Sequence, residues 1–420
     1  MMAFAQDLRL SLPLVVFATA WVMVLILVSI YTDQDLSPGL ILTVAAIIRI
    51  MVLFRAPELS DDIFRYLWDG LQTVSGHNPY QLAPAQVVSG SQAARTLLPL
   101  VNHPGLITVY PPGAQVVFFA AALIGPWPIV LKTLLVLMDL ATCALIIQWL
   151  RQLGQPVTRS LIYAWHPLAV LEIAGSGHID GAGIFFLFLS LTLAQTIWNS
   201  KIRPLCLGLS GGLFAWSCLV KLFPLVFFPL FFFSLHKRQR ILFLAGAVSG
   251  TLLLCHPFLP DLPHMFGTLG TYTRHWEFSG FSFFWLRQWG LSGDLSRVIL
   301  GSAFVLALTG IVCRYALGPG DFTHRVFYPF YLINLAFLFL TPTLHPWYAL
   351  YMTAMLPFVP GMAGVILSWS VFLAYSVQIP YVLTGAWTED PLSINLIWAG
   401  PLGACFAGYL VKAFGKSSTV

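Results

Sequence analysis

"LSLPLVVFATAWVMVLILVSIY", residues 10–31, contains no charged side chain and is long enough to cross the hydrocarbon core of a bilayer as one helix. Similar apolar runs recur along the 420-residue chain, which is 58% hydrophobic and only 9% charged. This pattern predicts an all-α polytopic membrane protein and excludes a soluble core. Ala18-Thr19-Ala20 resembles a signal-peptide cleavage site, but the apolar run continues to Ile30, which favours an uncleaved helix.

Apolar runs predict the other membrane helices as well. Including the first, the expected spans are 10–31, 39–54, 129–150, 159–173, 181–198, 203–219, 222–235, 240–257, 296–315, 325–341, 346–360, 363–383 and 393–411. Several are short, which is typical of kinked or tilted helices and agrees with the 28 prolines. A further apolar stretch, 111–126, is too short to assign, and loop 55–110 lies on the non-cytoplasmic side provided that this stretch is re-entrant or interfacial rather than spanning. The sequence therefore predicts a single integral membrane domain over residues 1–420, with about 11 to 14 membrane helices.

Basic residues gather in alternate loops, as the positive-inside rule requires of cytoplasmic loops. The basic positions are Arg151 with Arg159, Lys201 with Arg203, the run 236–240, Arg314 with Arg325, and Lys412 with Lys416. The loops between them, including 55–110 and 256–290, then face the non-cytoplasmic side. We expect a multi-pass protein of the cell (inner) membrane, and the first two spans leave the side of the N-terminus open. The net charge of +5 is too scattered to predict nucleic-acid binding.

The first non-cytoplasmic loop contains "SDDIFRYLWDG", residues 60–70, with three carboxylates and an arginine. On a helix over 61–74, the side chains of Asp62, Arg65, Tyr66 and Asp69 share one narrow arc. The opposite side is apolar and consists of Ile63, Phe64, Leu67, Leu71 and Val74. We therefore expect an interfacial amphipathic helix, with its apolar side against lipid or the bundle and its charges facing outward.

The carboxylates of this helix are not equivalent. Asp61 lies outside the polar arc, and it or Ser60 is placed to cap the helix N-terminus. Asp62 has no such structural role, although it could form an i,i+3 ion pair with Arg65 worth about 0.2–0.5 kcal/mol. Helical geometry therefore leaves a functional role open for Asp62, with an ion pair on a solvated surface as the alternative.

Several motifs in this order resemble membrane glycosyltransferases of the GT-C fold, in the group that uses a sugar linked to polyprenyl phosphate, commonly mannose. The motifs are "SDDIFRYLWDG" with "GHNPY" (76–80), "TVYPPGAQ" (108–115), "WHPLAVLEIAGSGHIDG" (165–181), "LVKLFPL" (219–225) and "HPWY" (345–348). The resemblance runs from about residue 60 to 350. It implies a GT-C type bundle whose active site faces the non-cytoplasmic side, with 55–110 as the catalytic loop.

The resemblance implies an inverting reaction, in which one displacement at the sugar C1 joins an acceptor hydroxyl and releases polyprenyl phosphate. An aspartate of the first external loop is the base in this family, and Asp62 matches that position, with Asp61 as the neighbouring candidate. Cations or hydrogen-bond donors must then meet the charge on the departing phosphate. Arg65 is one candidate, unless it orients Asp62. Lys221 is another, unless it only snorkels at a helix end.

Other polar residues on the same predicted face are candidates for substrate binding. They are Tyr66, Asp69, Tyr110, His178, Asp180, Arg274, His275 and His345. Most have a structural alternative, such as an interfacial anchor for Tyr110 or a cap for Asp180. Arg274 and His275 stand between aromatic residues in the loop 256–290, where they either bind donor or acceptor or belong to an ordinary surface loop.

The expected partners are a polyprenyl-phosphate sugar donor, a glycan or glycolipid acceptor and the lipid bilayer, without a cofactor. Asp61, Asp62 and Asp69 could bind a hard cation through oxygen, but three carboxylates beside an arginine do not define a metal cage. The alternative function is a secondary transporter or lipid flippase that uses membrane-proximal His, Asp and Lys residues. A scaffold subunit is a third possibility.

Overall fold

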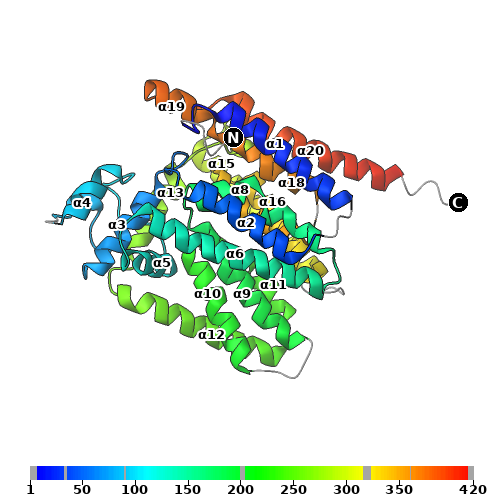
Figure 1. Cartoon of the computed structure of the whole chain (residues 1–420), viewed down its shortest axis with the longest axis horizontal. Helices are drawn as coiled ribbons and strands as arrows, with labels where there is room; N and C mark the ends of the chain where they lie inside the picture. Colours follow the sequence, from blue (N-terminus) through cyan, green and yellow to red (C-terminus); the bar gives the residue numbers. More distant parts are fainter. Residues whose placement is uncertain are drawn as a thin grey trace. The chain divides into compact units, whose positions relative to one another are not determined.

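The computed structural model describes residues 7–32, 36–88, 91–198, 204–315, 323–359 and 361–414. Every extended regular element in these ranges is a helix, and β pairing is confined to isolated bridges between Thr343 and Phe278 or Ser279 (Figure 1). The all-α prediction is therefore confirmed for the part of the chain described.

Backbone contacts divide the expected single domain into two compact units. The terminal unit comprises Met1–Gln34, Leu161–Leu168 and Glu277–Val420, and the central unit comprises Asp35–Ser160 and Ala169–Trp276. Both catalytic candidates and all but one of the substrate-binding candidates fall in the central unit; the exception is His345.

The terminal unit contains helices from both ends of the chain. Its helices are α1 (Leu12–Tyr31), α7 (Leu161–Ala164), α14 (Phe281–Gln288), α15 (Gly293–Tyr315), α16 (Tyr328–Leu340), α17 (Leu350–Met355), α18 (Met362–Ser370), α19 (Gln378–Thr384) and α20 (Pro391–Phe414). Within this unit α18 packs against α20, and α15 packs against α16. The short α8 (Pro167–Ala169) joins the sequence of this unit to that of the central unit.

The central unit contains the remaining helices. They are α2 (Pro38–Leu53), α3 (Asp62–Val74), α4 (Gln92–Leu97), α5 (Pro112–Ala122), α6 (Pro128–Gln152), α9 (Asp180–Trp198), α10 (Pro204–Val220), α11 (Phe228–Ser234), α12 (Lys237–Cys255) and α13 (His264–His275). Here α10 packs between α9 and α12, α6 packs against α2 and α9, and α3 packs against α5 (Figure 1).

By length and composition, the described residues contain six helices able to cross a membrane. A helix pair, Pro167–Gly175 with Asp180–Ala194, is bent by 115° at a short break and would raise the number to seven. Apolar helices of 10–17 residues are Pro38–Leu53, Pro112–Ala122, Leu205–Val220, Phe223–Ser234 and Arg325–Leu340. The chain is thus a multi-pass helical membrane protein. The expected 11 to 14 spans exceed the number of full-length helices, because several apolar runs form short or bent helices.

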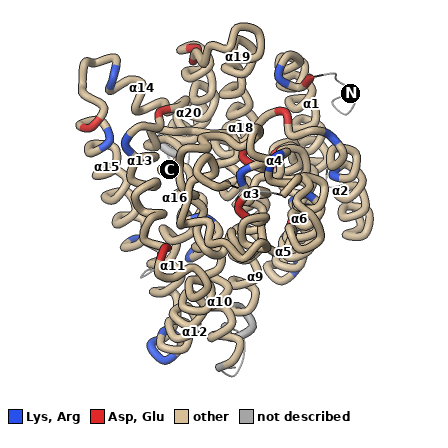
Figure 2. The backbone as a smooth tube through the Cα atoms, turned by 90° about the vertical axis from the view of Figure 1, so that its left-hand side faces the viewer, with Lys and Arg blue, Asp and Glu red and all other residues tan. Residues whose placement is uncertain are grey.

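Charged residues are sparse along most of the backbone, and basic residues gather at the turn where α12 begins (Figure 2). Lys237 and Arg238 are exposed at this turn. Of the other basic residues used to predict the topology, Lys201, Arg203 and Lys416 lie outside the described residues.

A buried ion pair joins α2 to α6 within the apolar part of the central unit. Arg49 Nε lies 2.6 Å from Asp139 Oδ2, and neither side chain is exposed. Arg49 also donates to the carbonyl oxygen of Ala45 at 3.0 Å. Because removal of one partner would leave a buried charge unpaired, the pair ties these two helices together.

Helices α10 and α12 approach so closely that glycine is required at their crossing. A Cβ atom on Gly211 would collide with the carbonyl of Phe243, and one on Gly246 would collide with the carbonyl of Gly208. On Gly250 it would lie 2.9 Å from the Cα atom of Gly212. Small residues at such crossings let two backbones come into van der Waals contact inside a membrane.

We predict that Gly246→Leu separates α10 from α12 and lowers the thermal unfolding temperature of the purified protein in detergent by several degrees, since overpacking costs about 1–3 kcal/mol. Gly301→Leu is the matched control, because Gly301 lies in α15 with open space around its Cα atom. Equal unfolding temperatures for the two variants would contradict the close crossing.

Candidate functional site

Helix α3 begins at Asp62 and ends at Val74, so the predicted helix over 61–74 is confirmed. The prediction that its polar side faces outward is wrong. Arg65 is 5% exposed, and Tyr66 and Asp69 are each 1% exposed, whereas Val74 on the apolar side is 41% exposed. The polar arc is covered because residues 106–115 supply hydrogen-bond partners for it, which an isolated helix cannot reveal.

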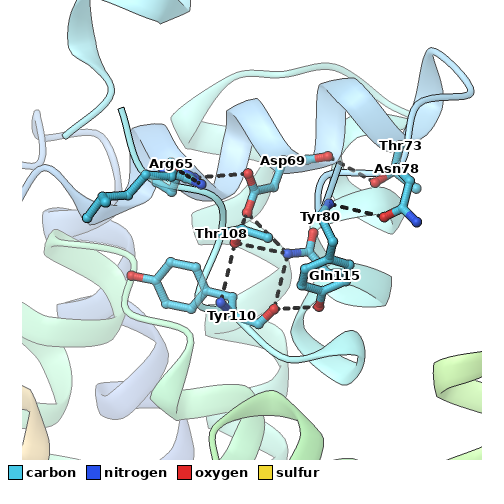
Figure 3. A network of polar contacts seen from close by, with 9 residues as sticks. Arg65, Asp69, Thr73, Asn78, Tyr80, Thr108, Tyr110 and Gln115 are labelled. Atoms are coloured by element: carbon cyan, nitrogen blue, oxygen red, sulfur yellow. Dashed lines mark hydrogen bonds and ion pairs between the residues drawn. The ribbon is translucent and has the colours of Figure 1, made fainter. Parts of the chain in front are cut away.

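The carboxylate of Asp69 is the centre of a buried network (Figure 3). Arg65 Nε donates to Asp69 Oδ1 at 3.0 Å, while Thr108 Oγ1 and Gln115 Nε2 both donate to Asp69 Oδ2. Gln115 Nε2 also lies 3.3 Å from the carbonyl oxygen of Tyr110. These contacts hold α3 against the segment that leads into α5.

The network accounts for several predicted substrate-binding residues. Arg65 pairs with Asp69 rather than Asp62, and its second donor reaches the carbonyl oxygen of Leu106 at 2.9 Å. The Tyr66 ring meets the Tyr110 ring edge-on, with centroids 4.8 Å apart. Burial raises the pKa of both tyrosines well above the ordinary value, so both hydroxyls stay protonated.

Asp61 and Asp62 share one amide donor. Asn102 Nδ2 lies 3.0 Å from Asp61 Oδ1 and 2.8 Å from Asp62 Oδ1. Asp61 occupies the N-cap position of α3, but its side chain does not cap the helix, so that predicted role is wrong. Ser60 Oγ instead accepts from the Asp62 backbone N–H at 3.3 Å. Asn102 draws the Asp61 carboxylate away from the helix end.

His178 lies between two carboxylates at the break of the bent helix pair. Its Nδ1 is 3.9 Å from Asp62 Oδ2, and its Nε2 is 3.4 Å from Glu172 Oε2. The side chain of His178 is 1% exposed and that of Glu172 is fully buried, whereas the Asp62 side chain is 22% exposed. The sequence pattern predicted a role for His178 but missed Glu172, although Glu172 belongs to the same quoted motif.

Lys221 and Asp180 form an ion pair next to this group. Lys221 Nζ lies 2.8 Å from each carboxylate oxygen of Asp180. The Lys221 side chain is 25% exposed, while that of Asp180 is 1% exposed. Both charges act on the pKa of Asp62, so the pair lies near that carboxyl group. Lys221 therefore has a protein partner and does not simply snorkel to the interface.

The environment of Asp62 raises its pKa to about 6. Burial is the largest cause and the negative charge of Asp61 adds to it, whereas the Asn102 hydrogen bond and the Lys221 charge oppose it. A carboxyl group with this pKa exchanges protons near neutral pH, which is the property required of a general base.

The part of the loop 256–290 that belongs to the central unit contacts the first loop, 55–110. Asn78 Nδ2 donates to the carbonyl oxygen of Phe258 and to Asp261, each at 2.9 Å. His103, which follows the Asp62 partner Asn102, meets the Trp276 ring edge-on at 4.8 Å. Trp276 follows α13, and this contact links the C-terminal end of α13 to the site.

Arg274 and His275 lie on the last turn of α13 and are exposed. His345 belongs to the terminal unit, where its ring stacks on Trp347 at 4.3 Å and on Phe278 at 4.7 Å. A part for His345 in the site remains a prediction.

The described residues contain no cluster of three His, Cys, Asp or Glu side chains able to hold a metal ion. The Asp61 and Asp62 carboxylates, which the sequence offered as oxygen ligands, both accept from the amide of Asn102. An amide N–H group donates rather than accepts, so it competes with a cation for these oxygens.

Comparison with known proteins adds nothing to this geometry: no protein-family model matches the sequence, and neither the curated proteins nor the solved structures give a significant match.

We predict that Asp69→Asn destabilises the protein by about 3–5 kcal/mol, because it leaves the buried Arg65 guanidinium without its counter-charge. The measurement is the thermal unfolding temperature in detergent. Asp61→Asn is the control, since Asp61 is exposed and its loss strands no buried cation. A result in which Asp61→Asn unfolds at the lower temperature would mean that the Asp69 network does not hold α3.

Proposed function

We propose that the protein is an inverting glycosyltransferase that moves a sugar, mannose in the first instance, from polyprenyl phosphate to an acceptor hydroxyl on the non-cytoplasmic side of the membrane. The observation that carries the proposal is the Asp62 carboxyl group. It combines partial exposure with a pKa of about 6, whereas Asp69 is enclosed and fully hydrogen-bonded.

Asp62 is the proposed base. Its carboxylate removes the proton from the acceptor hydroxyl while that oxygen attacks C1 of the sugar, and polyprenyl phosphate leaves from the opposite face. Asn102 holds one oxygen of the carboxylate, which leaves Oδ2 directed toward the His178 side. Hydrogen bonding to one oxygen orients the base without saturating it.

Lys221 is the proposed cation for the leaving phosphate. Its ammonium group is close enough to lower the pKa of Asp62, and it is partly exposed. The Arg65 guanidinium, by contrast, is bonded to Asp69 and to a backbone carbonyl. Arg65 therefore serves the position of α3, and Arg274 with His275 at the end of α13 are the further candidates for binding the donor phosphate or the acceptor.

We predict that Asp62→Asn abolishes sugar transfer, because an amide cannot accept the proton. Asp61→Asn is the matched control and is expected to lower activity less, since Asp61 acts only through the shared Asn102 donor. The assay reconstitutes the purified variants in lipid with labelled polyprenyl-phosphate sugars and a panel of acceptors. Near-normal turnover by Asp62→Asn would remove Asp62 from the mechanism.

We also predict that kcat/KM falls below pH about 6, where Asp62 becomes protonated. The same shift has the opposite sign for stability: a carboxyl whose folded pKa is raised binds its proton more tightly when folded, so this group's contribution falls as the pH rises from about 4 to 6. Asp62→Asn should therefore unfold at no lower temperature than the wild type at pH 8. A fall in kcat/KM centred near pH 4 instead would contradict the raised pKa of Asp62.

A secondary transporter or lipid flippase is the second candidate, and one observation favours it. The bent pair Pro167–Gly175 and Asp180–Ala194 has His178 and Asp180 at its break, and interrupted helices of this kind form binding sites in transporters. Reconstituted vesicles separate the two functions, because a transferase yields a glycosidic product whereas a transporter moves substrate without one.

A further inference from the structure

The backbone between α8 and α9 places His178 close to Asp62. Residues Val170–Gly175 form a π-helical segment, a rare form that is enriched at functional sites. Gly177 follows with a φ of +79°, which favours glycine. A Cβ atom on Gly177 would lie 2.6 Å from Cδ1 of Ile63, so the turn touches the first turn of α3. The backbone N–H of His178 donates to the carbonyl oxygen of Glu172 at 2.9 Å.

This turn places an imidazole between two carboxyl groups of different exposure. Asp62 faces the solvent side, with 22% of its side chain exposed, and Glu172 at the far side of the ring is fully buried. The ring is 3.9 Å from the first carboxylate and 3.4 Å from the second. A buried carboxylate stabilises positive charge on a neighbouring imidazole, so the ring can hold a proton that reaches it.

We propose that His178 and Glu172 form the buried end of a proton relay, which receives through Asp62 the proton that the acceptor hydroxyl gives up. The proposal rests on the proposed glycosyltransferase function and deepens it. His178 and Glu172 are positioning and proton-holding residues behind the base, and they do not touch the sugar.

The acceptor O–H bond breaks and its oxygen forms the bond to C1 of the sugar, while the C1–O bond to phosphate breaks and the phosphate keeps that electron pair. Asp62 takes the proton. Closing the 3.9 Å gap to His178 lets Nδ1 accept it, which makes an imidazolium beside the Glu172 carboxylate. The proton returns through Asp62 to water after the products leave.

Other charged groups near Asp62 and His178 affect the pKa of Asp62. Asp61 and Asp180 raise the pKa of Asp62, and Lys221 lowers it. From α6, the aliphatic part of Lys132 borders the Gly177 turn, and its ammonium group donates to the carbonyl oxygen of Arg55 at 2.8 Å. Lys221 thus pairs with Asp180, and Lys132 donates to a backbone carbonyl. The carboxylate of Glu172 lies 3.4 Å from Nε2 of His178, the ring nitrogen farther from Asp62.

The test compares His178→Gln with His178→Leu in the sugar-transfer assay across pH 5–9. Glutamine keeps an N–H donor but cannot take up a proton. If His178 had only a structural role, His178→Gln would therefore keep the activity and His178→Leu would lose it. We expect both variants to lose on the order of 100-fold in kcat, with KM for the donor unchanged. We expect Glu172→Gln to lose about 10-fold and Glu172→Asp to keep part of the activity, because aspartate retains the charge.

Chemical rescue and infrared titration complete the test. Imidazole added to His178→Gly should restore part of the rate if the ring carries a proton. The infrared carboxyl band of Asp62, identified by its absence in Asp62→Asn, should titrate at a different pH in His178→Leu, because in the wild type the carboxyl group and the imidazole share the proton. This band can be followed in protein that does not turn over.

The outcomes separate the relay from the function. A wild-type kcat and pH profile in His178→Gln, or an unchanged Asp62 titration in His178→Leu, would overturn the relay and leave the transferase intact. Absence of transfer by the wild-type protein would instead overturn the proposed function. Should the His178 variants fail to fold, Glu172→Gln decides, because a wild-type kcat in that variant also overturns the relay.

Discussion

The buried carboxylate of Asp69 is the constraint on which the site depends. At 1% exposure it can stay charged only with full compensation, and Arg65, Thr108 and Gln115 supply it. These donors come from α3 itself and from residues 106–115, so satisfying one charge fixes the helix against the segment that enters α5. Asp62 lies on the same helix about two turns earlier, and its position follows from that attachment.

Helical periodicity predicted which side chains of α3 lie together but not what covers them. The arc is present, yet Arg65, Tyr66 and Asp69 face protein, and only Asp62 is partly exposed. A single helix carries no information about partners that come from far along the chain. Capping by Asp61 failed for the same reason, because a donor from Asn102, 41 residues away, competes for its carboxylate.

The residues that sequence reasoning missed are those whose roles depend on long-range contacts. Glu172 sits within an apolar run and reaches His178 only because the backbone bends between the two helix halves. Arg49 and Asp139 were a readable signal, since a charge inside each of two predicted spans implies that they pair. The apolar runs themselves were recovered as helices, although bends and short helices leave fewer full-length spans than the runs suggested.

Four carboxyl groups of the central unit differ in how many cations and hydrogen-bond donors contact them. This difference separates the structural carboxylates from the proposed catalytic one. Asp139 has a guanidinium at 2.6 Å, Asp180 has an ammonium group on both oxygens, and Asp69 has three donors. Each of these three carboxylates is therefore in direct contact with a cationic side chain. Asp62 has an amide donor on one oxygen and an imidazole 3.9 Å from the other. Asp62 is thus the least compensated of these four carboxylates, and with its pKa raised to about 6 it is the one best suited to act as a base.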